Sequence, residues 1–199
     1  GGMVVTDNKE YWSRMWSYKD HGKDFHDDAT ADKSSGFQYV QHSLGTNWRL
    51  TEMQSKIGLL QLGKMPEWHA KRTEHANRLR LRAQSLSALR IPEIPDHIEH
   101  AWYKLDFFLK PEALKDGWDQ IRIVSELRAL GVGSSYGGCS EIYREAAFTD
   151  RGMGPANPLK NAAELGRTNI MFQVHPTLQA DEIEQIADAM EFVIDSATR

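Results

Sequence analysis

The sequence contains a single cysteine, Cys139, so no disulfide can form within its 199 residues. A chain without internal disulfides fits a reducing compartment, and we predict a cytoplasmic protein. No apolar run is long enough to span a bilayer, so no membrane partner is predicted. The net charge of −4 gives no bulk attraction to nucleic acid. These absences argue against membrane and nucleic-acid partners and leave a globular protein.

Familiar catalytic motifs are missing as well. There is no Gly-rich phosphate loop, no H-E-x-x-H pair of zinc ligands, no G-x-S-x-G nucleophile elbow and no internal repeat. Hydrophobic residues make up 40% and charged residues 26% of the chain, which is ordinary for a folded domain. At this length the chain can bury one sizeable core or two small ones.

Residues 20–44 form a polar stretch, rich in Gly, Asp, Ser and His, that follows neither a helical nor a strand pattern. Such a long stretch inside a compact domain is usually functional or mobile. Its candidate metal ligands are His21, His26, Asp27, Asp28 and His42. Their spacing does not match a known site, so we interpret them as solvated loop side chains and predict no metal.

The chain opens with Gly1-Gly-Met-Val-Val5, which predicts a strand entered from a tight turn. Asp7 or Asn8 can then cap a helix that runs to about Tyr18. A natural chain rarely begins in the middle of a strand, so we expect further residues upstream of Gly1.

A capped helix is predicted from Thr51. Thr51 and Gln54 have the spacing of a capping box, in which each residue satisfies a free N–H of the other. Gly63 is expected to end this helix, and Pro66 to begin a second one that runs to about Leu86.

Two features of these helices need an explanation. Gly58 lies inside the first helix, where glycine costs stability, so we expect close packing against another element there. The second helix carries a basic stripe of Lys71, Arg72, Arg78, Arg80 and Arg82. A DNA-reading helix would carry such a stripe, but in an acidic chain a solvated helix face is favoured.

The three residues before Leu50 carry the most distinctive chemistry. If Asn47-Trp48-Arg49 is extended, Asn47 and Arg49 point to one side and Trp48 to the other. An amide donor and a guanidinium beside the free N–H groups of a helix N-terminus suit a phosphate or a carboxylate. The alternative is a loop arginine in a surface ion pair, and spacing alone favours that alternative.

Pro92 and Pro95 mark a boundary, after which strands and helices alternate. Residues 100–109 predict a strand with Ala101, Tyr103, Leu105, Phe107 and Leu109 on one face, and Trp102, Lys104, Asp106 and Phe108 on the other. The other predicted elements are a turn or short helix at 111–116, a helix at 118–130 that buries Ile121, Val124 and Leu127, strands at 132–136 and 169–174, and helices at 161–165 and 181–196. This order predicts a small α/β or α+β layer domain, and the connections do not fix whether its sheet is parallel.

Several of these segments together resemble one family. They are Gly1–Thr6, Lys19–Gly22, Gly45–Gln54 with Ile57 and Gly58, Trp68 with Arg72, and His175–Leu178. Their sequences and order are similar to those of the DegT/DnrJ/EryC1/StrS sugar aminotransferases, which are PLP (pyridoxal 5'-phosphate) enzymes with the aspartate aminotransferase fold, fold type I. The resemblance runs along the whole chain but matches only the C-terminal half of the family.

The resemblance implies a division of the chain. Residues 1–65 would be a remnant of the large PLP-binding domain, residues 66–88 a connecting helix and residues 89–199 the C-terminal small domain. The lysine that forms the Schiff base with PLP is expected upstream of Gly1, and none of the lysines present matches it. By this resemblance the chain holds no main catalytic group and would be inactive alone.

The resemblance also assigns roles to the Asn47 block. Asn47 matches the residue that hydrogen-bonds the PLP phosphate of the partner subunit, in a homodimer with shared active sites. Arg49 matches an arginine on the substrate side of the same site. Both roles agree with the anion site argued from geometry, so the preference for a surface ion pair is reversed.

Tyr103, Ser140, Tyr143 and His175 lie in small-domain segments that the resemblance places near the sugar-nucleotide site. Each also has a structural explanation, as a core-edge aromatic, a loop polar group or a histidine at a strand end. Cys139 is expected to be a small buried hydrophobic residue and not a nucleophile, because no base is spaced to activate it.

The resemblance implies an aminotransferase that moves an amino group from glutamate, through PLP, to a keto-sugar nucleotide. A PLP-dependent sugar dehydratase of the same family, with histidine in place of the lysine, is the first alternative. The second is a non-catalytic homologue that binds PLP or a sugar nucleotide, for which the basic stripe around Arg78 is the only support. The residue at the Schiff-base position distinguishes the three.

Overall fold

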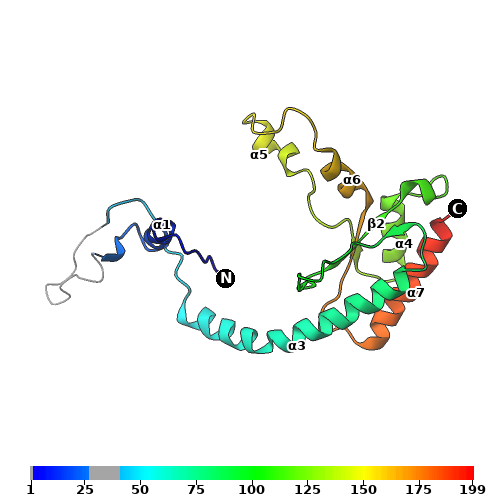
Figure 1. The fold of residues 1–199 in the computed structure, drawn as a ribbon, viewed down its shortest axis with the longest axis horizontal. Coiled ribbons are helices and arrows are strands. Elements are labelled where there is room, and N and C mark those ends of the chain that lie inside the picture. The colour runs from blue at the N-terminus through cyan, green and yellow to red at the C-terminus, as the bar shows by residue number, and fades with distance from the viewer. Residues whose placement is uncertain (1, 27–40) are drawn as a thin grey trace. The chain divides into compact units, whose positions relative to one another are not determined.

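The computed structural model describes residues 2–26 and 41–199 (Figure 1). The chain divides into an N-terminal unit, Gly1–Met65, and a C-terminal unit, Pro66–Arg199. The boundary falls inside the long helix α3, Glu52–Ala83. Each unit is therefore described by itself.

The N-terminal unit contains one helix before α3. Helix α1 runs over Lys9–Lys19, and the side chain of Asn8 caps it by accepting from the backbone N–H groups of Glu10 and Tyr11. This confirms the predicted helix. The predicted opening strand is wrong for the described residues, since residues 2–7 form no strand and Met3, Val4 and Val5 are all exposed. A strand needs a neighbour to pair its backbone, and no described residue pairs with this segment.

Helix α3 begins as the sequence predicts but does not end there. The capping box is confirmed, because Thr51 N–H donates to Gln54 Oε1 at 3.0 Å and Gln54 N–H donates to Thr51 Oγ1 at 3.3 Å. The predicted break between Gly63 and Pro66 is wrong, and one helix of 32 residues passes through Pro66. Proline removes one backbone bond, whereas starting a second helix would require a new nucleus.

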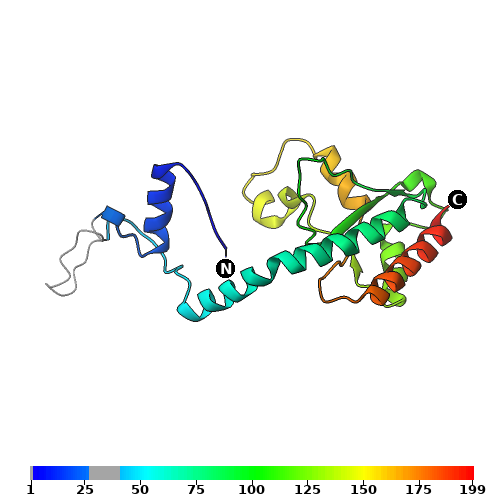
Figure 2. The same cartoon turned by 60° about the horizontal axis from the view of Figure 1, so that its bottom comes forward.

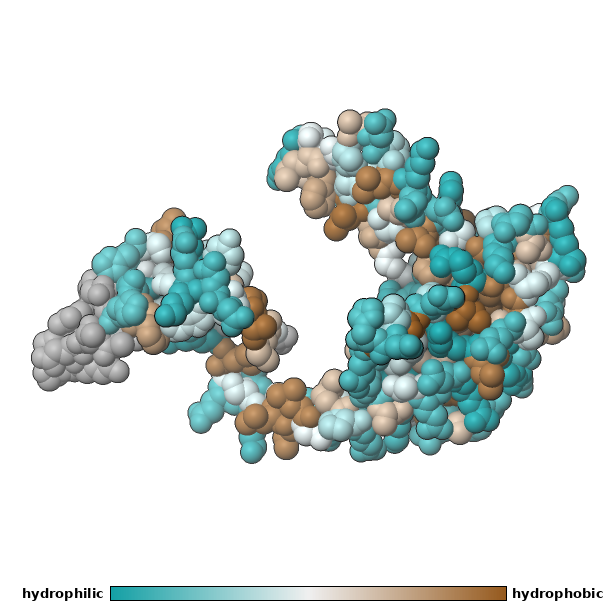
Figure 3. All heavy atoms as spheres, viewed as in Figure 1, coloured by the Kyte–Doolittle hydropathy of each residue, from teal (hydrophilic) through white to brown (hydrophobic). Residues whose placement is uncertain are grey.

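The N-terminal half of α3 is exposed. A Cβ placed on Gly58 would meet no described atom within 4 Å, so the predicted close packing is absent within this part of the chain. Apolar side chains of this half also lie in the open (Figure 3): Met53, Ile57, Leu59, Leu60 and Leu62.

The C-terminal unit is built on a four-stranded sheet of order β1-β2-β4-β3. Its strands are β1 (Leu89–Arg90), β2 (Leu105–Leu109), β3 (Ser134–Ser135) and β4 (Asn169–Phe172). Every neighbouring pair is antiparallel, which settles the question that the sequence left open. In the central pair, Leu105 lies opposite Phe172 and Phe108 lies opposite Asn169.

The remaining elements are helices, of which α7 is the longest. Helix α4 spans Gln120–Ala129, α5 spans Ala146–Thr149, α6 spans Lys160–Thr168 and α7 spans Ala180–Ala197. Two 3-10 helices, η2 and η3, span Pro111–Ala113 and Ile142–Arg144. The predicted helices near 118–130, 161–165 and 181–196 are confirmed with small shifts, while α5 and η3 were not predicted.

One face of the sheet is the core. Leu105, Phe107 and Leu109 of β2 are buried, as predicted, with α4, α7 and the C-terminal part of α3 gathered beside the sheet (Figure 2). The other face, which carries Asp106 and Phe108, is half-buried. Alternation along the strand therefore separates a core face from an open face, which is partly accessible to solvent.

Two predicted core positions are wrong. Trp102 is buried and Tyr103 is 80% exposed, the reverse of the predicted alternation, because Trp102 has φ 47° and the regular strand begins only at Leu105. Ile121 is 63% exposed and Ile123 is fully buried instead, because Asp119 caps the helix and places Ile121 in the outer part of its first turn.

The basic stripe of α3 is partly neutralised by α7. Arg82 bonds Glu184 at 3.0 Å, Asp188 at 2.6 Å and Glu191 at 2.5 Å, and Arg78 also pairs with Glu184. The hydrogen bonds that Arg82 donates to Glu191 and Asp188 raise the pKa of Arg82, and the same bond from Arg82 lowers the pKa of Glu191. Through these pairs, Arg78 and Arg82 join α3 to α7. Their positive charge is neutralised, which argues against a nucleic-acid-binding surface here.

Within the described ranges, none of the helices combines the length and apolar character needed to cross a membrane.

Candidate active-site segments

The Asn47-Trp48-Arg49 segment has the geometry that its alternation predicts. Arg49 Nε donates to Asn47 Oδ1 at 3.2 Å, so these two side chains lie on the same side. The ring of Trp48 instead meets the ring of Tyr18 edge-on, with centroids 5.3 Å apart. A backbone bridge between Asn47 and Asp20 fixes this segment beside the end of α1.

Asp20 orients Arg49. Its side chain is 8% exposed, and its Oδ1 lies 3.6 Å from Arg49 Nε and has no hydrogen bond to any described residue. Arg49 Nη2 also lies 3.5 Å from His21 Nε2. Asp20 lies in the Lys19–Gly22 run that resembles the family, but no pattern in the sequence predicts a role for it. A nearby signal is Gly22, two residues further on, which has φ +80° and marks a tight turn against the Ser43 backbone.

This arrangement combines the two alternatives left by the sequence. Arg49 does form an ion pair within the chain, with Asp20. Asn47 uses only its oxygen, so its Nδ2 has no hydrogen-bond partner among the described residues. The capping box occupies the N–H groups of Thr51 and Gln54 and does not engage those of Glu52 and Met53, so the anion-binding hypothesis rests first on the amide and the guanidinium.

The candidate metal ligands do not form a site in the part of the chain that the structure describes. There, no group of three His, Cys, Asp or Glu residues is placed to hold a metal ion. Asp27 and Asp28 lie outside the described residues.

Of the four predicted substrate residues in the C-terminal unit, Ser140 lines the pocket on the half-buried face of the sheet, and Tyr103, Tyr143 and His175 are not part of that lining. Tyr103 projects into solvent, and Arg72 Nη1 holds its carbonyl and that of Trp102, each at 3.2 Å. His175 is exposed and its Nδ1 lies 2.8 Å from Thr177 Oγ1. These two residues lie apart from the pocket lining, and their proposed roles rest on the resemblance alone.

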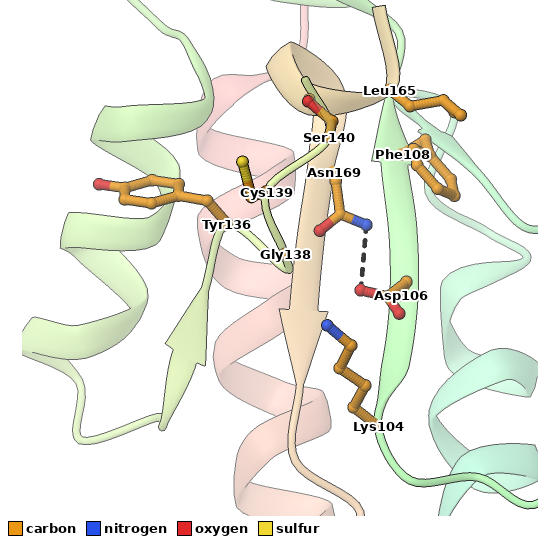
Figure 4. A pocket seen from close by; sticks show the side chains of 10 residues that line it. Lys104, Asp106, Phe108, Tyr136, Gly138, Cys139, Ser140, Leu165 and Asn169 are labelled. Atoms are coloured by element: carbon orange, nitrogen blue, oxygen red, sulfur yellow. Dashed lines mark hydrogen bonds between the residues drawn. The ribbon is translucent and has the colours of Figure 1, made fainter. Parts of the chain in front are cut away.

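The pocket has a volume of about 240 Å³ and lies on the open face of the sheet (Figure 4). Its lining comes from β2, the loop after β3, α6 and β4, and consists of Lys104, Asp106, Phe108, Tyr136, Gly138, Cys139, Ser140, Leu165, Gly166 and Asn169. At its floor, Asn169 Nδ2 donates to Asp106 Oδ1 at 3.0 Å. Cys139 is exposed, so the prediction that it is buried is wrong, because it lies on the loop above the sheet.

Tyr143 is engaged within the chain. Its hydroxyl donates to Glu141 Oε1 at 2.5 Å and accepts from the Leu159 N–H at 3.0 Å. The bond from Tyr143 lowers the pKa of Glu141, and the same bond raises the pKa of Tyr143. The Tyr143 hydroxyl therefore links Glu141 to Leu159, the two ends of a segment, residues 141–159, that we call the arm.

This link is expected to depend on pH. Because the folded pKa of Glu141 is lowered, its contribution to stability is present above the ordinary glutamate pKa and is lost as the pH falls through the folded value. We expect amide exchange at Leu159, corrected for the intrinsic rate, to lose protection in acid. In Tyr143→Phe the protection should be low at every pH. Protection that is independent of pH in the wild type would contradict this account.

Comparisons with known proteins agree with this fold. An aminotransferase structure from Psychrobacter cryohalolentis is 38% identical, with a TM-score of 0.89, over 97% of this chain and 51% of that one. The lipopolysaccharide biosynthesis protein RfbH of Salmonella typhimurium is 23% identical over 207 residues, or 96% of this chain and 47% of RfbH. The E. coli GDP-4-keto-6-deoxy-D-mannose-3-dehydratase with bound hydrated PLP, 19% identical, shares the fold with a TM-score of 0.74 over 94% of this chain and 49% of that one.

The chain spans about half the length of the relatives it matches. The expected fold class, a portion of the PLP-dependent aminotransferase fold, is confirmed. Residues 1–191, nearly the whole chain, also match the sequence model of one protein family. The chain therefore belongs to the DegT/DnrJ/EryC1/StrS aminotransferase family.

Proposed function

We propose that this chain is the C-terminal part of a PLP-dependent aminotransferase that transfers an amino group from glutamate to a keto-sugar nucleotide. The complete enzyme would work in the cytoplasm as a homodimer with shared active sites. Residues 1–65 would belong to its large domain, 66–88 to a connecting helix and 89–199 to its small domain. The observation that carries the proposal is the Asn47–Arg49 donor pair, which Asp20 orients in a chain of this family.

The donors present fit the phosphate of PLP. Asn47 Nδ2 offers two N–H groups without a partner among the described residues, and a phosphate oxygen accepts such bonds. Arg49 would hold an anionic group of the substrate, and the Asp20 carboxylate keeps its guanidinium in place. When bound, PLP supplies the electron sink for the reaction. The Asn47–Arg49 segment would bind and orient the cofactor phosphate and the substrate.

In the small domain, Tyr103, Ser140 and His175 remain proposed contacts to the substrate. The proposal assigns Tyr143 an indirect part, since its hydroxyl is committed to Glu141 and Leu159. It would hold the arm next to the pocket in place and not touch the sugar itself.

Isotope transfer in the full-length protein tests the proposed reaction. The protein is incubated with PLP, ¹⁵N-glutamate and 4-keto-6-deoxyhexoses linked to UDP, dTDP or GDP, and the products are analysed by mass spectrometry. The aminotransferase proposal expects the label in the sugar. A deoxysugar without nitrogen would support the dehydratase alternative, and binding without any product would support a non-catalytic homologue. The dehydratase outcome is included because a sugar dehydratase structure has the same fold.

A further inference from the structure

Another cavity of the C-terminal unit lies between one face of α3 and the segment 94–102. It has a volume of about 360 Å³ and shares no lining residue with the pocket on the open face of the sheet. On its helix side it is lined by His69, Thr73, Asn77 and Arg80, at spacings of four, four and three residues. These spacings place the four side chains along one face of the helix, so this wall of the cavity is polar.

Arg80 carries a charge that the described part of the chain does not neutralise. Its Nη1 donates to the Pro92 carbonyl at 2.9 Å, and its guanidinium carbon lies 5.6 Å from the centre of the Trp102 ring. Its Nε and Nη2 have no partner among the described residues, whereas Arg78 and Arg82 of the same helix pair with carboxylates of α7. Partial burial lowers the pKa of Arg80 because it removes water from the charge. Since Nε and Nη2 form the edge with which arginine binds a carboxylate through two parallel bonds, Arg80 can hold an anion.

Thr73 has a hydroxyl that the fold does not use. Its Oγ1 is buried and makes no hydrogen bond to any residue that the structure describes. A threonine inside a helix can bond the carbonyl four residues earlier, as Thr168 does with Glu164 at 2.9 Å, but Thr73 does not. A buried hydroxyl without a partner costs free energy, so it indicates a polar ligand atom in this cavity.

The opposite wall is apolar and is held in place. It is formed by Ile94, Ile98 and Trp102. Trp102 has φ 47°, a left-handed conformation that is rare for a bulky residue. Two bonds fix it there, since Arg72 Nη1 donates to its carbonyl at 3.2 Å and its own N–H donates to His100 Nδ1 at 2.9 Å. Backbone strain that is maintained by surrounding contacts is concentrated at functional sites, which supports a binding role for this wall.

Charge and size narrow the kind of ligand. Glu99 also lines the cavity and lies 3.5 Å from His69 Nδ1, so the net positive charge of the site is small. It therefore suits one negative charge better than a doubly charged phosphate. At about 30 Å³ per water, the volume holds roughly twelve waters, which is space for one or two rings with a short acidic chain.

We propose that this cavity binds a small organic acid, with its carboxylate on Arg80 and Thr73 and an aromatic ring against Ile94, Ile98 and Trp102. An inorganic anion would meet the same guanidinium but leave the apolar wall without a partner. Glutamate has no ring, and its ammonium group would bring a positive charge close to Arg80. The proposal goes beyond the proposed function and does not depend on it.

Calorimetric titration of the full-length protein with PLP bound tests this site without turnover. The probes are indole-3-acetate and phenylacetate, each compared with its amide, which has the same shape without the charge, and inorganic phosphate. We expect the acids to bind at least about tenfold more tightly than their amides. Arg80→Met should raise the Kd of the acids by about ten- to 100-fold, the effect of lost hydrogen bonds between charged groups. Arg90→Met is the matched control, because Arg90 also lies over an aromatic ring, that of Phe108, and should leave this Kd unchanged.

A second variant keeps the test valid if Arg80→Met, which also loses its bond to Pro92, does not fold. Thr73→Val keeps the shape of the side chain and removes only the hydroxyl. We expect it to raise the Kd of the acids by about two- to tenfold, the effect of one hydrogen bond. Without a ligand its thermal midpoint should not fall, because a buried hydroxyl without a partner does not stabilise the fold.

Several results would overturn the proposal. They are the absence of binding of either acid to the wild type, equal affinity for acid and amide, and wild-type affinity for the acids in both variants. Phosphate that binds as tightly as the acids would identify a site for anions in general. Displacement of the acids by glutamate would identify a site for the amino donor. Because no reaction is measured, the site can stand if ¹⁵N transfer fails, and can fail if transfer succeeds.

Discussion

Replacing Phe107 by alanine is expected to lower the free energy of unfolding of the C-terminal unit by about 3–5 kcal/mol. Phe107 is fully buried at the centre of β2, and its ring centroid lies 5.8 Å from that of Phe172. Deleting the ring removes apolar burial and leaves a cavity between the sheet and its helices, which a close-packed core only partly refills. Hydrogen exchange of the β4 amides, whose strongest protection reports opening of the whole unit, measures the loss.

Phe192→Ala is the matched control for this substitution. It removes the same ring from the same unit, but Phe192 is 65% exposed on α7. Its expected effect is within about 0.5 kcal/mol, as for most surface positions. Equal losses in the two variants would mean that the sheet and helices are not packed as described.

Local patterns predicted much of this fold because they depend on neighbouring residues. The capping box at Thr51 and the buried alternation of Leu105, Phe107 and Leu109 needed only spacing. The failures depend on information from elsewhere in the chain. Trp102 turns inward through a positive φ, and its carbonyl is held by Arg72, a residue of another element. No periodicity within residues 100–109 contains that contact.

Pro66 illustrates a different limit. Rules for proline describe the cost of one lost backbone bond, and on that basis the sequence predicts two helices. The structure keeps one helix, because a second helix that began at Pro66 would need a new nucleus, which costs more than the one lost bond.

In the candidate sites, too, features that depend on neighbouring residues were predicted and features that depend on distant residues were missed. The Asn47 and Arg49 side chains were predicted to share a side because strand alternation is local. Asp20 was missed as their partner because only the tertiary bridge to Asn47 brings it there. The Asp106–Asn169 pair spans 63 residues of sequence and exists because β2 and β4 are neighbours in the sheet. Sequence alone gave neither residue a reason to be singled out.

Asn47→Ala in the full-length protein is expected to weaken retention of PLP by about 1–3 kcal/mol, the usual cost of losing a hydrogen bond to a charged group. This corresponds to a rise in the Kd of about five- to 150-fold. The physical reason is Asn47 Nδ2, which has no partner among the residues that the structure describes and is the donor proposed to meet the cofactor phosphate. Equilibrium dialysis of PLP against the apoprotein measures the change, and Asn161→Ala, an exposed amide on α6, is the control.

Two further comparisons separate a phosphate contact from a general loss of structure. Pyridoxal lacks the phosphate, so its affinity should be the same in the wild type and in Asn47→Ala. Asn47→Asp keeps an oxygen that accepts from Arg49 Nε but replaces the N–H donors by a second carboxylate oxygen. It should therefore bind PLP more weakly than Asn47→Ala, because two negative groups would then face each other. If Asn47→Asp retained PLP as well as the wild type, Asn47 would only position Arg49 and would not touch the phosphate.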